Sequence, residues 1–475
     1  MQYIVNFVNY YFTYTIPQFI KYEIKVPLYQ LRKERHKGKR FKKFIVQNNY
    51  DMNIYNEFPM ENAYQLGNMN QFNIYNNIPN YNNNFPNYNN INNININNNT
   101  YPNYKNNNLS NNFGIEEQVL KPHEHLRGLV NIASTCYMNS TLQCFAHIGE
   151  LYSYFKKPKI LALIDAPEND NKLFPVFAEL ITYMWDPIDT SPLYPYIFKE
   201  KLGQLNPLFS GALPNDAKDL LTFMLMQLHE ELNNPVNNNN INQNMMINPM
   251  IQRDKKAMLK NFSKYFMNNF RSIISALFYG LNFTQTQCQF CKTMVYNYQT
   301  FNFLIFPLFE VLNYKMKLVN FQNNFNNTVT LEECFQYNQI TQPLSDYYCN
   351  ICKQTTQGSY SSFISVSPNI IIIILNRGTG LQYNVKIDFE ENLDLKNYVE
   401  FLKENSFYEL IGVVTHYGES GASGHFMARC KSPLDNYWYL YNDAIVEKIG
   451  FFTKENFTMG HPYILFYKKT NFANK

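Results

Sequence analysis

The spacing of hydrophobic and polar residues predicts both helices and strands from about residue 126 onward. Apolar residues that recur every three to four positions indicate helices, and strict alternation indicates half-buried strands. On this basis helices are expected at residues 137–145 (amphipathic), 217–232 and about 331–337. Strands are expected within residues 294–308 and at residues 426–430 and 437–443. The two patterns together predict a mixed helix-and-sheet domain.

Two Asn-rich tracts show no such period. From about Asn68 to Asn112 the sequence consists mainly of Asn, Tyr, Ile and Pro. Low-complexity polar sequence of this kind cannot bury a core, so we interpret it as a disordered linker. The second tract, Asn233 to Asn248, follows the helix predicted at residues 217–232. It is interpreted as a surface insertion.

The N-terminal segment is aromatic and apolar but is interrupted by polar residues. Residues 1–30 contain no apolar run of 18 or more, so no membrane-spanning helix is predicted. A positively charged start and a small-residue cleavage site are both missing, which argues against a secretory signal. A weak interfacial anchor remains an alternative. The basic run at residues 32–43 fits either a nuclear-import or acidic-partner patch or a solvated basic tail.

Composition is compatible with a folded enzyme and narrows its function only slightly. The chain has 475 residues, of which 17% are aromatic, and a net charge of +4 that is too small to indicate nucleic acid. Eight cysteines lie at positions 136, 144, 288, 291, 334, 349, 352 and 430. Four of them form two CxxC pairs, a pattern that suits a reducing compartment better than a disulfide framework.

Cys136 stands where a loop is expected to enter a helix. The thiolate is the nucleophilic form of cysteine, and the positive end of a helix dipole favours it. Thr135 is a candidate N-cap for this helix. A lone cysteine is more often a buried structural residue, so the assignment of Cys136 depends on finding a base elsewhere in the chain.

His425 is the candidate base. It follows a Gly-Ala-Ser-Gly sequence and opens the strand predicted at residues 426–430. Asn442 and Asp443 end the second aromatic strand. If the two strands are adjacent, the side chain of residue 442 or 443 reaches the imidazole. Cys136 would then attack, His425 would transfer the proton, and Asn442 would orient the ring.

The two CxxC pairs predict a structural zinc site. Four thiolates, from Cys288, Cys291, Cys349 and Cys352, can surround one tetrahedral Zn²⁺. Their separation fits the tip of a long antiparallel excursion. The alternative is a hairpin of reduced cysteines that has lost its metal. A redox CxxC is disfavoured, because neither pair opens a βαβ unit.

The segments around Cys136 and His425 resemble the Cys box and His box of the ubiquitin-specific protease family, and the resemblance covers residues 126–469. Residues 368–377 and 463–467 resemble two further strands of that family, although Gly378 replaces an aromatic residue. The resemblance implies an α+β, papain-like cysteine protease fold. A helical thumb, a β-rich palm and antiparallel β fingers that carry a zinc ribbon are expected.

The resemblance also implies roles for further residues. Asn131 corresponds to the oxyanion donor that acts with the Cys136 backbone N–H, and Asp443 is an auxiliary residue beside Asn442. The ubiquitin tail is expected to contact three residues, Asp216, Asp219 and Phe426. The chain departs from the family at several positions: Ala133-Ser134 replaces Gly-Asn, Pro214-Asn215 replaces Gln-Gln, Asp219 replaces Glu, Leu220 replaces Phe, and Phe426 replaces Tyr.

Other candidates are discounted. His416 matches a family position but is interpreted as a structural histidine near the cleft. Cys144 and Cys430 are interpreted as small core residues rather than nucleophiles. For Asp216 and Asp219, the alternative role is a negative charge at a helix N-terminus, where it complements the macrodipole.

The hypothesis is a cysteine isopeptidase that hydrolyses the bond at the C-terminal glycine of ubiquitin, in the cytoplasm, the nucleus or both. It would need structural Zn²⁺ but no catalytic cofactor, and no nucleic-acid partner is expected. Alternatives are an inactive ubiquitin-binding scaffold and a protease for a ubiquitin-like modifier; a nucleic-acid-binding zinc protein would leave Cys136 and His425 unexplained.

The predicted domains are an N-terminal extension (residues 1–67), a linker (68–120) and a catalytic domain (121–470) with an insertion at 233–248 and fingers at about 283–360. The oligomeric state is not indicated.

Overall fold

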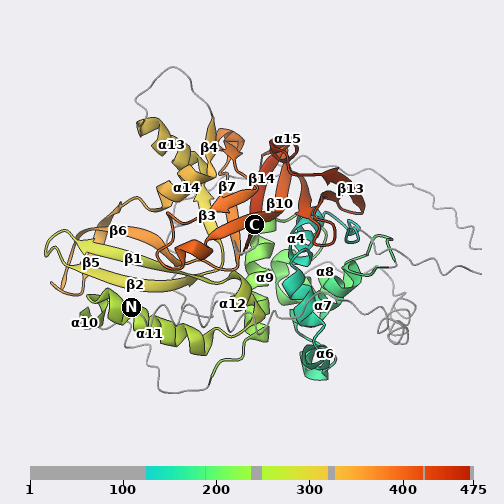
Figure 1. Cartoon of the computed structure of the whole chain (residues 1–475), viewed down its shortest axis with the longest axis horizontal. Coiled ribbons are helices and arrows are strands. Elements are labelled where there is room, and N and C mark those ends of the chain that lie inside the picture. Colours follow the sequence, from blue (N-terminus) through green and yellow to red (C-terminus); the bar gives the residue numbers. More distant parts are fainter. Residues whose placement is uncertain (1–124, 188, 237–248, 319–326, 421–422, 471–475) are drawn as a thin grey trace, which may run out of the picture. The chain divides into compact units, whose positions relative to one another are not determined.

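The computed structural model describes residues 125–187, 189–236, 249–318, 327–420 and 423–470. The expectations for the N-terminal extension, the basic run, the linker and most of the Asn-rich insertion therefore lie outside the described residues. Within the described part, helices dominate up to about residue 278 and strands dominate after it. The described part thus has the mixed architecture that the sequence predicts (Figure 1).

The helical part follows the Cys136 loop along the chain. Its main helices are α4 (Cys136–Ala146), α5 (Gly149–Phe155), α6 (Pro158–Ile164), α7 (Leu173–Met184), α8 (Tyr196–Leu205), α9 (Ala217–Leu232), α10 (Pro249–Gln252), α11 (Lys255–Asn269) and α12 (Ile273–Phe278). Polar caps define several of the starts: Asp216 accepts a hydrogen bond from the Lys218 N–H, and Ser272 forms a capping box with Ser275. Helix α9 has the bounds that its apolar spacing predicts.

Helix α4 differs from the expectation in one respect. An amphipathic helix was expected at residues 137–145, but all eleven residues of α4 are buried. The reason is its position: α4 contacts helix α9 as well as strands β10 (Phe407–Ser420), β11 (Ser423–Lys431) and β12 (Trp438–Asn442). Its polar side chains therefore lie inside the protein and need partners there.

An eight-stranded sheet carries the second half of the site. Seven strands follow the order β13-β12-β11-β10-β14-β7-β3, and β9 (Asn392–Asp394) pairs with β10. The remaining bounds are β3 (Leu304–Pro307), β7 (Ile370–Asn376), β13 (Ile445–Gly450) and β14 (His461–Lys469). Residues 368–377 and 463–467, expected as strands from the family resemblance, thus form β7 and β14 side by side. The observed strands are shorter than expected. Residues 302 and 303 interrupt the strand expected within 294–308, and Leu308 begins a helix. Residues 368, 369 and 377 lie outside β7, Tyr437 precedes β12, and Asp443 lies in the turn after β12.

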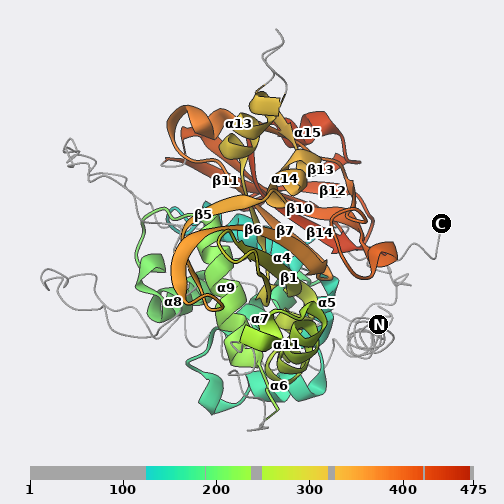
Figure 2. The same ribbon diagram turned by 90° about the vertical axis from the view of Figure 1, so that its left-hand side faces the viewer.

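The sheet is buried on both faces, as the continuous apolar run of β7 requires. Ile370, Ile372 and Ile374 face the core shared with helices α4 to α12. Ile371, Ile373 and Leu375 face a second core that contains Trp438 and residues of α13 (Leu308–Leu318), α14 (Leu331–Asn338) and α15 (Lys454–Thr458). Figure 2 shows α13, α14 and α15 on one side of strands β10 to β14 and helices α4, α7 and α9 on the other.

A separate four-stranded antiparallel sheet forms the excursion expected for the fingers (Figure 1). Its order is β2-β1-β6-β5, with β1 (Gly280–Cys288), β2 (Met294–Phe301), β5 (Gln342–Cys349) and β6 (Gln354–Val366). A small parallel pair, β4 (Thr328–Thr330) and β8 (Lys386–Asp388), completes the strands of the described residues. The two CxxC pairs stand at the ends of β1 and β5, on the same sheet.

Candidate active site

Cys136 is the first residue of α4, as the sequence predicts, and only 7% of it is exposed. Thr135 occupies the N-cap position but does not cap the helix with its side chain. Its hydroxyl accepts a hydrogen bond from the Ile132 N–H at 3.0 Å instead, so it stabilises the preceding loop. The thiol lies at the N-terminus of a buried helix, which is the positive end of the helix dipole.

The loop before Cys136 has an unusual backbone. Ala133 has φ 108° and Ser134 has φ 48°, both in the left-handed half of the map that favours glycine. Asn131 holds the loop from within, because its Oδ1 accepts a hydrogen bond from the Thr135 N–H at 2.9 Å. Ala133 therefore stands at a position of positive φ where the family has glycine.

His425 and Asn442 lie on paired strands, β11 and β12, as the sequence predicts. The His425 Nε2 lies 2.7 Å from the Asn442 Oδ1, an acceptor that holds the proton on Nε2. Nδ1 is therefore the nitrogen left for the thiol. The pKa of His425 is raised to about 9, chiefly by its hydrogen bond with Cys136, with smaller contributions from Asn442 and the charge of Asp443 that outweigh partial burial.

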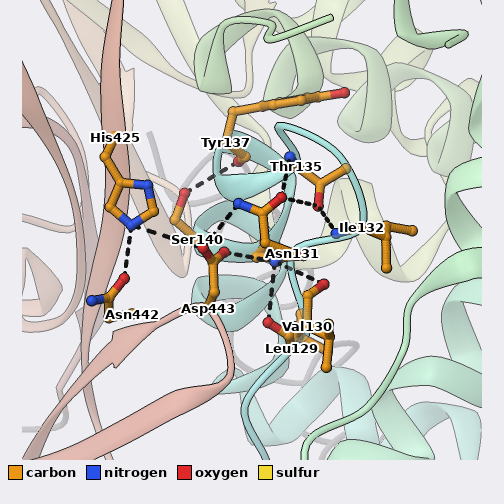
Figure 3. A network of polar contacts seen from close by, with 11 residues as sticks. Leu129, Val130, Asn131, Ile132, Thr135, Tyr137, Ser140, His425, Asn442 and Asp443 are labelled. Carbon is orange, nitrogen blue, oxygen red and sulfur yellow. Dashed lines mark hydrogen bonds and ion pairs between the residues drawn. The ribbon is translucent and has the colours of Figure 1, made fainter. Parts of the chain in front are cut away.

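Asp443 lies in the turn between β12 and β13 with φ 51°. Its Oδ2 accepts a hydrogen bond from the Asn131 Nδ2 at 3.0 Å and lies 3.8 Å from the His425 Nε2 (Figure 3). Its Oδ1 accepts a hydrogen bond from the Asn139 Nδ2 at 2.7 Å. Asp443 therefore connects the Cys136 loop, helix α4 and the histidine.

Asn131, the residue expected to donate to an oxyanion, is exposed and its amide nitrogen is directed to Asp443. An amide nitrogen has two hydrogens, so one remains after the bond with Asp443. Two bonds, to Thr135 and to Asp443, fix the plane of the amide. A donor whose orientation is fixed in advance is what stabilisation of an oxyanion requires.

The three residues expected to contact a ubiquitin tail differ in their exposure and in their contacts. Phe426 is 9% exposed and packs against His416 and Tyr463, with ring centroids 4.6 and 5.5 Å away. Asp216 caps α9, and its Oδ2 accepts a hydrogen bond from the Tyr463 hydroxyl at 2.7 Å. Asp219, in the first turn of α9, is exposed. The capping role accounts for Asp216 without a ligand, so tail binding stays a prediction for all three residues.

His416 has the features of a structural histidine. It is 2% exposed, and its Nδ1 is hydrogen-bonded to the Tyr383 hydroxyl. Burial lowers its pKa to about 4, so the ring is neutral at physiological pH. A Cβ on Gly424 would meet the His416 Nε2 at 2.4 Å, which shows that this ring packs directly against the residue before His425.

Two residues of the site were missed by the sequence reasoning. Asn139 is buried among the hydrophobic residues of α4 and binds Asp443, and Tyr463 on β14 binds Asp216. Asn139 lies one helical turn after Cys136, so its spacing was the one available signal. No local pattern indicates the partner of Tyr463, because 247 residues separate it from Asp216.

The four cysteines of the CxxC pairs come together. One Sγ from each lies within 4.8 Å of the others, and the pairs Cys288–Cys352 and Cys291–Cys349 are 3.9 and 3.7 Å apart. Tetrahedral zinc with Zn–S bonds of about 2.3 Å places its sulfurs about 3.8 Å apart. The donor set and the spacing therefore fit a structural zinc ion, and among the described residues this is the one such cluster of His, Cys, Asp and Glu.

The remaining cysteines behave as core residues. All eight cysteines are free thiols. Cys144 on α4 and Cys430 on β11 have Sγ atoms 3.8 Å apart and are completely enclosed. Burial raises the pKa of the Cys430 thiol well above its usual range, which makes it a poor nucleophile.

In the described part of the chain, no helix is long and apolar enough to span a membrane.

A known protein family matches most of this chain. The family model "Ubiquitin carboxyl-terminal hydrolase" matches residues 127–467, well over half of the chain. Relatives include ubiquitin carboxyl-terminal hydrolase Usp2 of Drosophila melanogaster, which is 26% identical and aligned over 73% of this chain and 35% of its own length. Ubiquitin carboxyl-terminal hydrolase 2 of Bos taurus is 25% identical, with 76% and 57% covered. The chain thus spans a third to three fifths of the length of these relatives.

A solved structure supports the fold. The SAGA DUB module Ubp8/Sgf11/Sus1/Sgf73 bound to monoubiquitin contains a chain that matches with a TM-score of 0.53 and 20% identity. The match covers 75% of this chain and 73% of that one. At this level of identity the likeness concerns the fold, and it agrees with the expected papain-like architecture with fingers.

Proposed function

The chain belongs to the ubiquitin carboxyl-terminal hydrolase family, and we propose from this that it is a cysteine-dependent deubiquitinase that hydrolyses the bond at the C-terminal glycine of ubiquitin. One observation supports the chemistry most directly: His425 bridges the Cys136 thiol and Asn442, and its pKa is raised to about 9. The raised pKa makes His425 a strong base toward the Cys136 thiol. Transfer of the thiol proton to His425 produces the thiolate that attacks the substrate.

The proposed reaction uses these groups in sequence. The Cys136 thiolate attacks the terminal carbonyl, and the oxyanion accepts hydrogen bonds from Asn131 and the Cys136 N–H. His425 donates its Nδ1 proton to the departing lysine amine, which leaves a thioester. Neutral His425 then removes a proton from water, and the hydroxide attacks the thioester and releases free Cys136. Asn442 keeps the Nε2 proton in place throughout.

The test of this function uses two probes. A ubiquitin carrying a C-terminal electrophile should form a covalent adduct with the wild type but not with Cys136→Ala, because the variant lacks the sulfur. Cys136→Ala should also lose hydrolysis of a ubiquitin–fluorophore amide, by at least about 10³-fold, and should still bind ubiquitin. Undiminished hydrolysis by Cys136→Ala would remove this cysteine from the mechanism. A parallel probe made from another modifier separates ubiquitin from ubiquitin-like substrates.

A catalytically weak ubiquitin-binding scaffold is the second candidate. The strained backbone at Ala133 and Ser134 favours it, because the loop that would carry the oxyanion donor departs from the family sequence there. Binding of ubiquitin without any adduct at Cys136 would support this reading. Rapid adduct formation would exclude it.

We further propose that the cysteine cluster holds zinc and that Asp216 and Asp219 line the path of the basic ubiquitin tail. Zinc would join the ends of β1 and β5 and stabilise the four-stranded sheet. Metal analysis of the purified chain should find about one zinc per molecule. Mutation of Cys349 to Ser should abolish that zinc, whereas Cys334→Ser, at a buried cysteine outside the cluster, should retain it. Zinc content that is equal in both variants would contradict the assignment.

Free cysteines and the family together support a reducing compartment, cytoplasm or nucleus, as the proposed location. The proposed catalytic domain, residues 121–470, contains every described element. Within it, the four-stranded sheet extends slightly beyond the expected finger region, because it begins at Gly280 and ends at Val366.

A further inference from the structure

Asn139 is a buried amide whose hydrogen bonds join three parts of the site. It is 2% exposed and lies one turn after Cys136 on α4. Its Nδ2 lies 2.7 Å from the Asp443 Oδ1, 3.2 Å from the Leu129 carbonyl and 3.3 Å from the Val130 carbonyl. One nitrogen thus contacts the turn after Asn442 and the start of the Cys136 loop at the same time.

The oxygen of the same amide has no such partner. Among the described residues, the Asn139 Oδ1 is one of the few buried side-chain oxygens without a hydrogen bond. A buried acceptor without a bond is unfavourable, and native proteins contain few of them. An apolar residue at this position would avoid that penalty. The hydrogen bonds of the Nδ2 atom are therefore the reason for an amide at this position.

The contacts of Asp443 show what the nitrogen holds in place. One carboxylate oxygen accepts from Asn139 and the other accepts from Asn131. The Asp443 backbone carbonyl also accepts the Leu129 N–H at 2.9 Å. A Cβ on Gly128 would meet the Ala444 carbonyl oxygen at 2.5 Å, so the two segments are in direct contact. The turn after β12 and the loop before α4 therefore form one packed unit.

We infer that Asn139 is a positioning residue for the proposed reaction, and that it acts through Asp443. Asn139 holds the Asp443 carboxylate in the orientation from which its second oxygen fixes the Asn131 amide. It also connects the helix that begins with Cys136 to the turn that follows Asn442. Without the Nδ2 donor, the carboxylate is free to rotate toward the His425 Nε2, only 3.8 Å away, and Asn131 loses its fixed orientation.

The inference rests on the proposed function and is tested by steady-state hydrolysis of a ubiquitin–fluorophore amide with the full chain. Asn139→Leu keeps the volume but removes the donor. We expect kcat to fall about 10- to 100-fold, less than the loss of an oxyanion donor itself, with KM within about two-fold. Thr141→Val is the matched control, because Thr141 is buried in the same helix and its hydroxyl binds only the Tyr137 carbonyl. Its kcat should stay within about two-fold of the wild type.

Two further measurements separate positioning from loss of structure. The first is the double variant Asn139→Leu with Asp443→Ala, which should be no slower than Asp443→Ala alone, because the two residues act in one chain of contacts. The second is Asn139→Asp, which preserves the shape of the side chain but offers no donor to Asp443. Its kcat should be no higher than that of Asn139→Leu. If the Leu variant does not fold, Asn139→Asp provides the test in its place.

The outcomes are distinct. Equal kcat for Asn139→Leu and Thr141→Val, full activity of Asn139→Asp, or losses that multiply in the double variant would each overturn the role of Asn139. A wild type that does not hydrolyse the substrate would contradict the proposed function itself.

Discussion

At the scale of single residues, the site depends on groups whose charge and orientation are set by neighbours far away in the chain. His425 receives its raised pKa from Cys136 and its orientation from Asn442. Asn131 and Asn139 both bind Asp443, which follows Asn442 directly. The chemistry therefore requires the turn after β12 and the loop before α4 to be placed together within hydrogen-bonding distance.

Ala133 is the residue where a substitution should improve the protein. Its φ of 108° is accessible mainly to glycine, and a non-glycine residue there costs about 1–3 kcal/mol. We expect Ala133→Gly to raise the free energy of unfolding by about 1 kcal/mol, after the added freedom of the unfolded chain is subtracted. The turnover of a ubiquitin–fluorophore amide should also rise, because the loop that holds Asn131 is relaxed.

Urea unfolding and kcat measure the two effects. Ala166→Gly is the matched control, because Ala166 has an ordinary φ of −79° and glycine should only destabilise the protein there. A fall in stability for Ala133→Gly equal to that for Ala166→Gly would show that the loop carries no strain.

At the scale of elements, helix starts are stabilised by carboxylates, one of which comes from a distant helix. The N-terminus of α7 has no side-chain cap of its own. Glu231 on α9 replaces it: its two carboxylate oxygens accept the Leu173 and Phe174 N–H groups, both at 2.8 Å. Such charge-assisted bonds satisfy free amides and complement the helix dipole.

Loss of this contact should be measurable. We expect Glu231→Ala to lower the free energy of unfolding by about 1–2 kcal/mol, the range for the loss of a helix cap. Glu230→Ala is the control, since Glu230 is exposed on the same helix and surface changes are usually within about 0.5 kcal/mol. Chemical denaturation of both variants compares them, and equal losses would mean that α7 does not depend on Glu231.

At the scale of the whole molecule, buried histidines and His425 make stability depend on pH in opposite directions. Burial lowers the pKa of three histidines, His147, His229 and His416, to about 4 each. Their usual pKa is about 6.5, so between pH 6.5 and 4 the unfolded chain binds more protons than the folded protein. Stability from these residues is complete above about pH 6.5 and is lost as pH falls toward 4.

His425 has the opposite sign. Its folded pKa of about 9 lies above the unfolded value, so its contribution is complete below about pH 6.5 and is lost as pH rises through 9. We therefore expect the combined contribution of these four histidines to be largest near pH 6.5. Buried Lys469, whose pKa is lowered to about 7, instead adds stability as pH rises above 7. Denaturant unfolding of the wild type and of Cys136→Ala at pH 5, 6.5 and 9 separates the His425 part, because only that part depends on Cys136. In Cys136→Ala the alkaline loss should become smaller, because Cys136 is the largest cause of the raised pKa; an unchanged alkaline loss would contradict that cause.

The sequence by itself predicted several of the elements and named the main residues of the candidate site. The apolar spacing predicted α9 with its correct bounds, the alternation at residues 426–430 lies within β11, and the CxxC pairs predicted a four-cysteine cluster. These features are local, because periodicity and motif spacing reflect how one segment meets the core or a ligand. For the same reason the family resemblance could assign Cys136 and His425 from two short boxes.

Only the tertiary structure decided which polar groups meet. It showed that α4 is buried on all sides, that Thr135 stabilises a loop and that Asp216 is engaged by Tyr463. It also brought Asn139 to Asp443 across 304 residues. Side-chain hydrogen bonds between distant segments leave no period in the sequence, because they depend on how strands and helices pack rather than on the residues beside them.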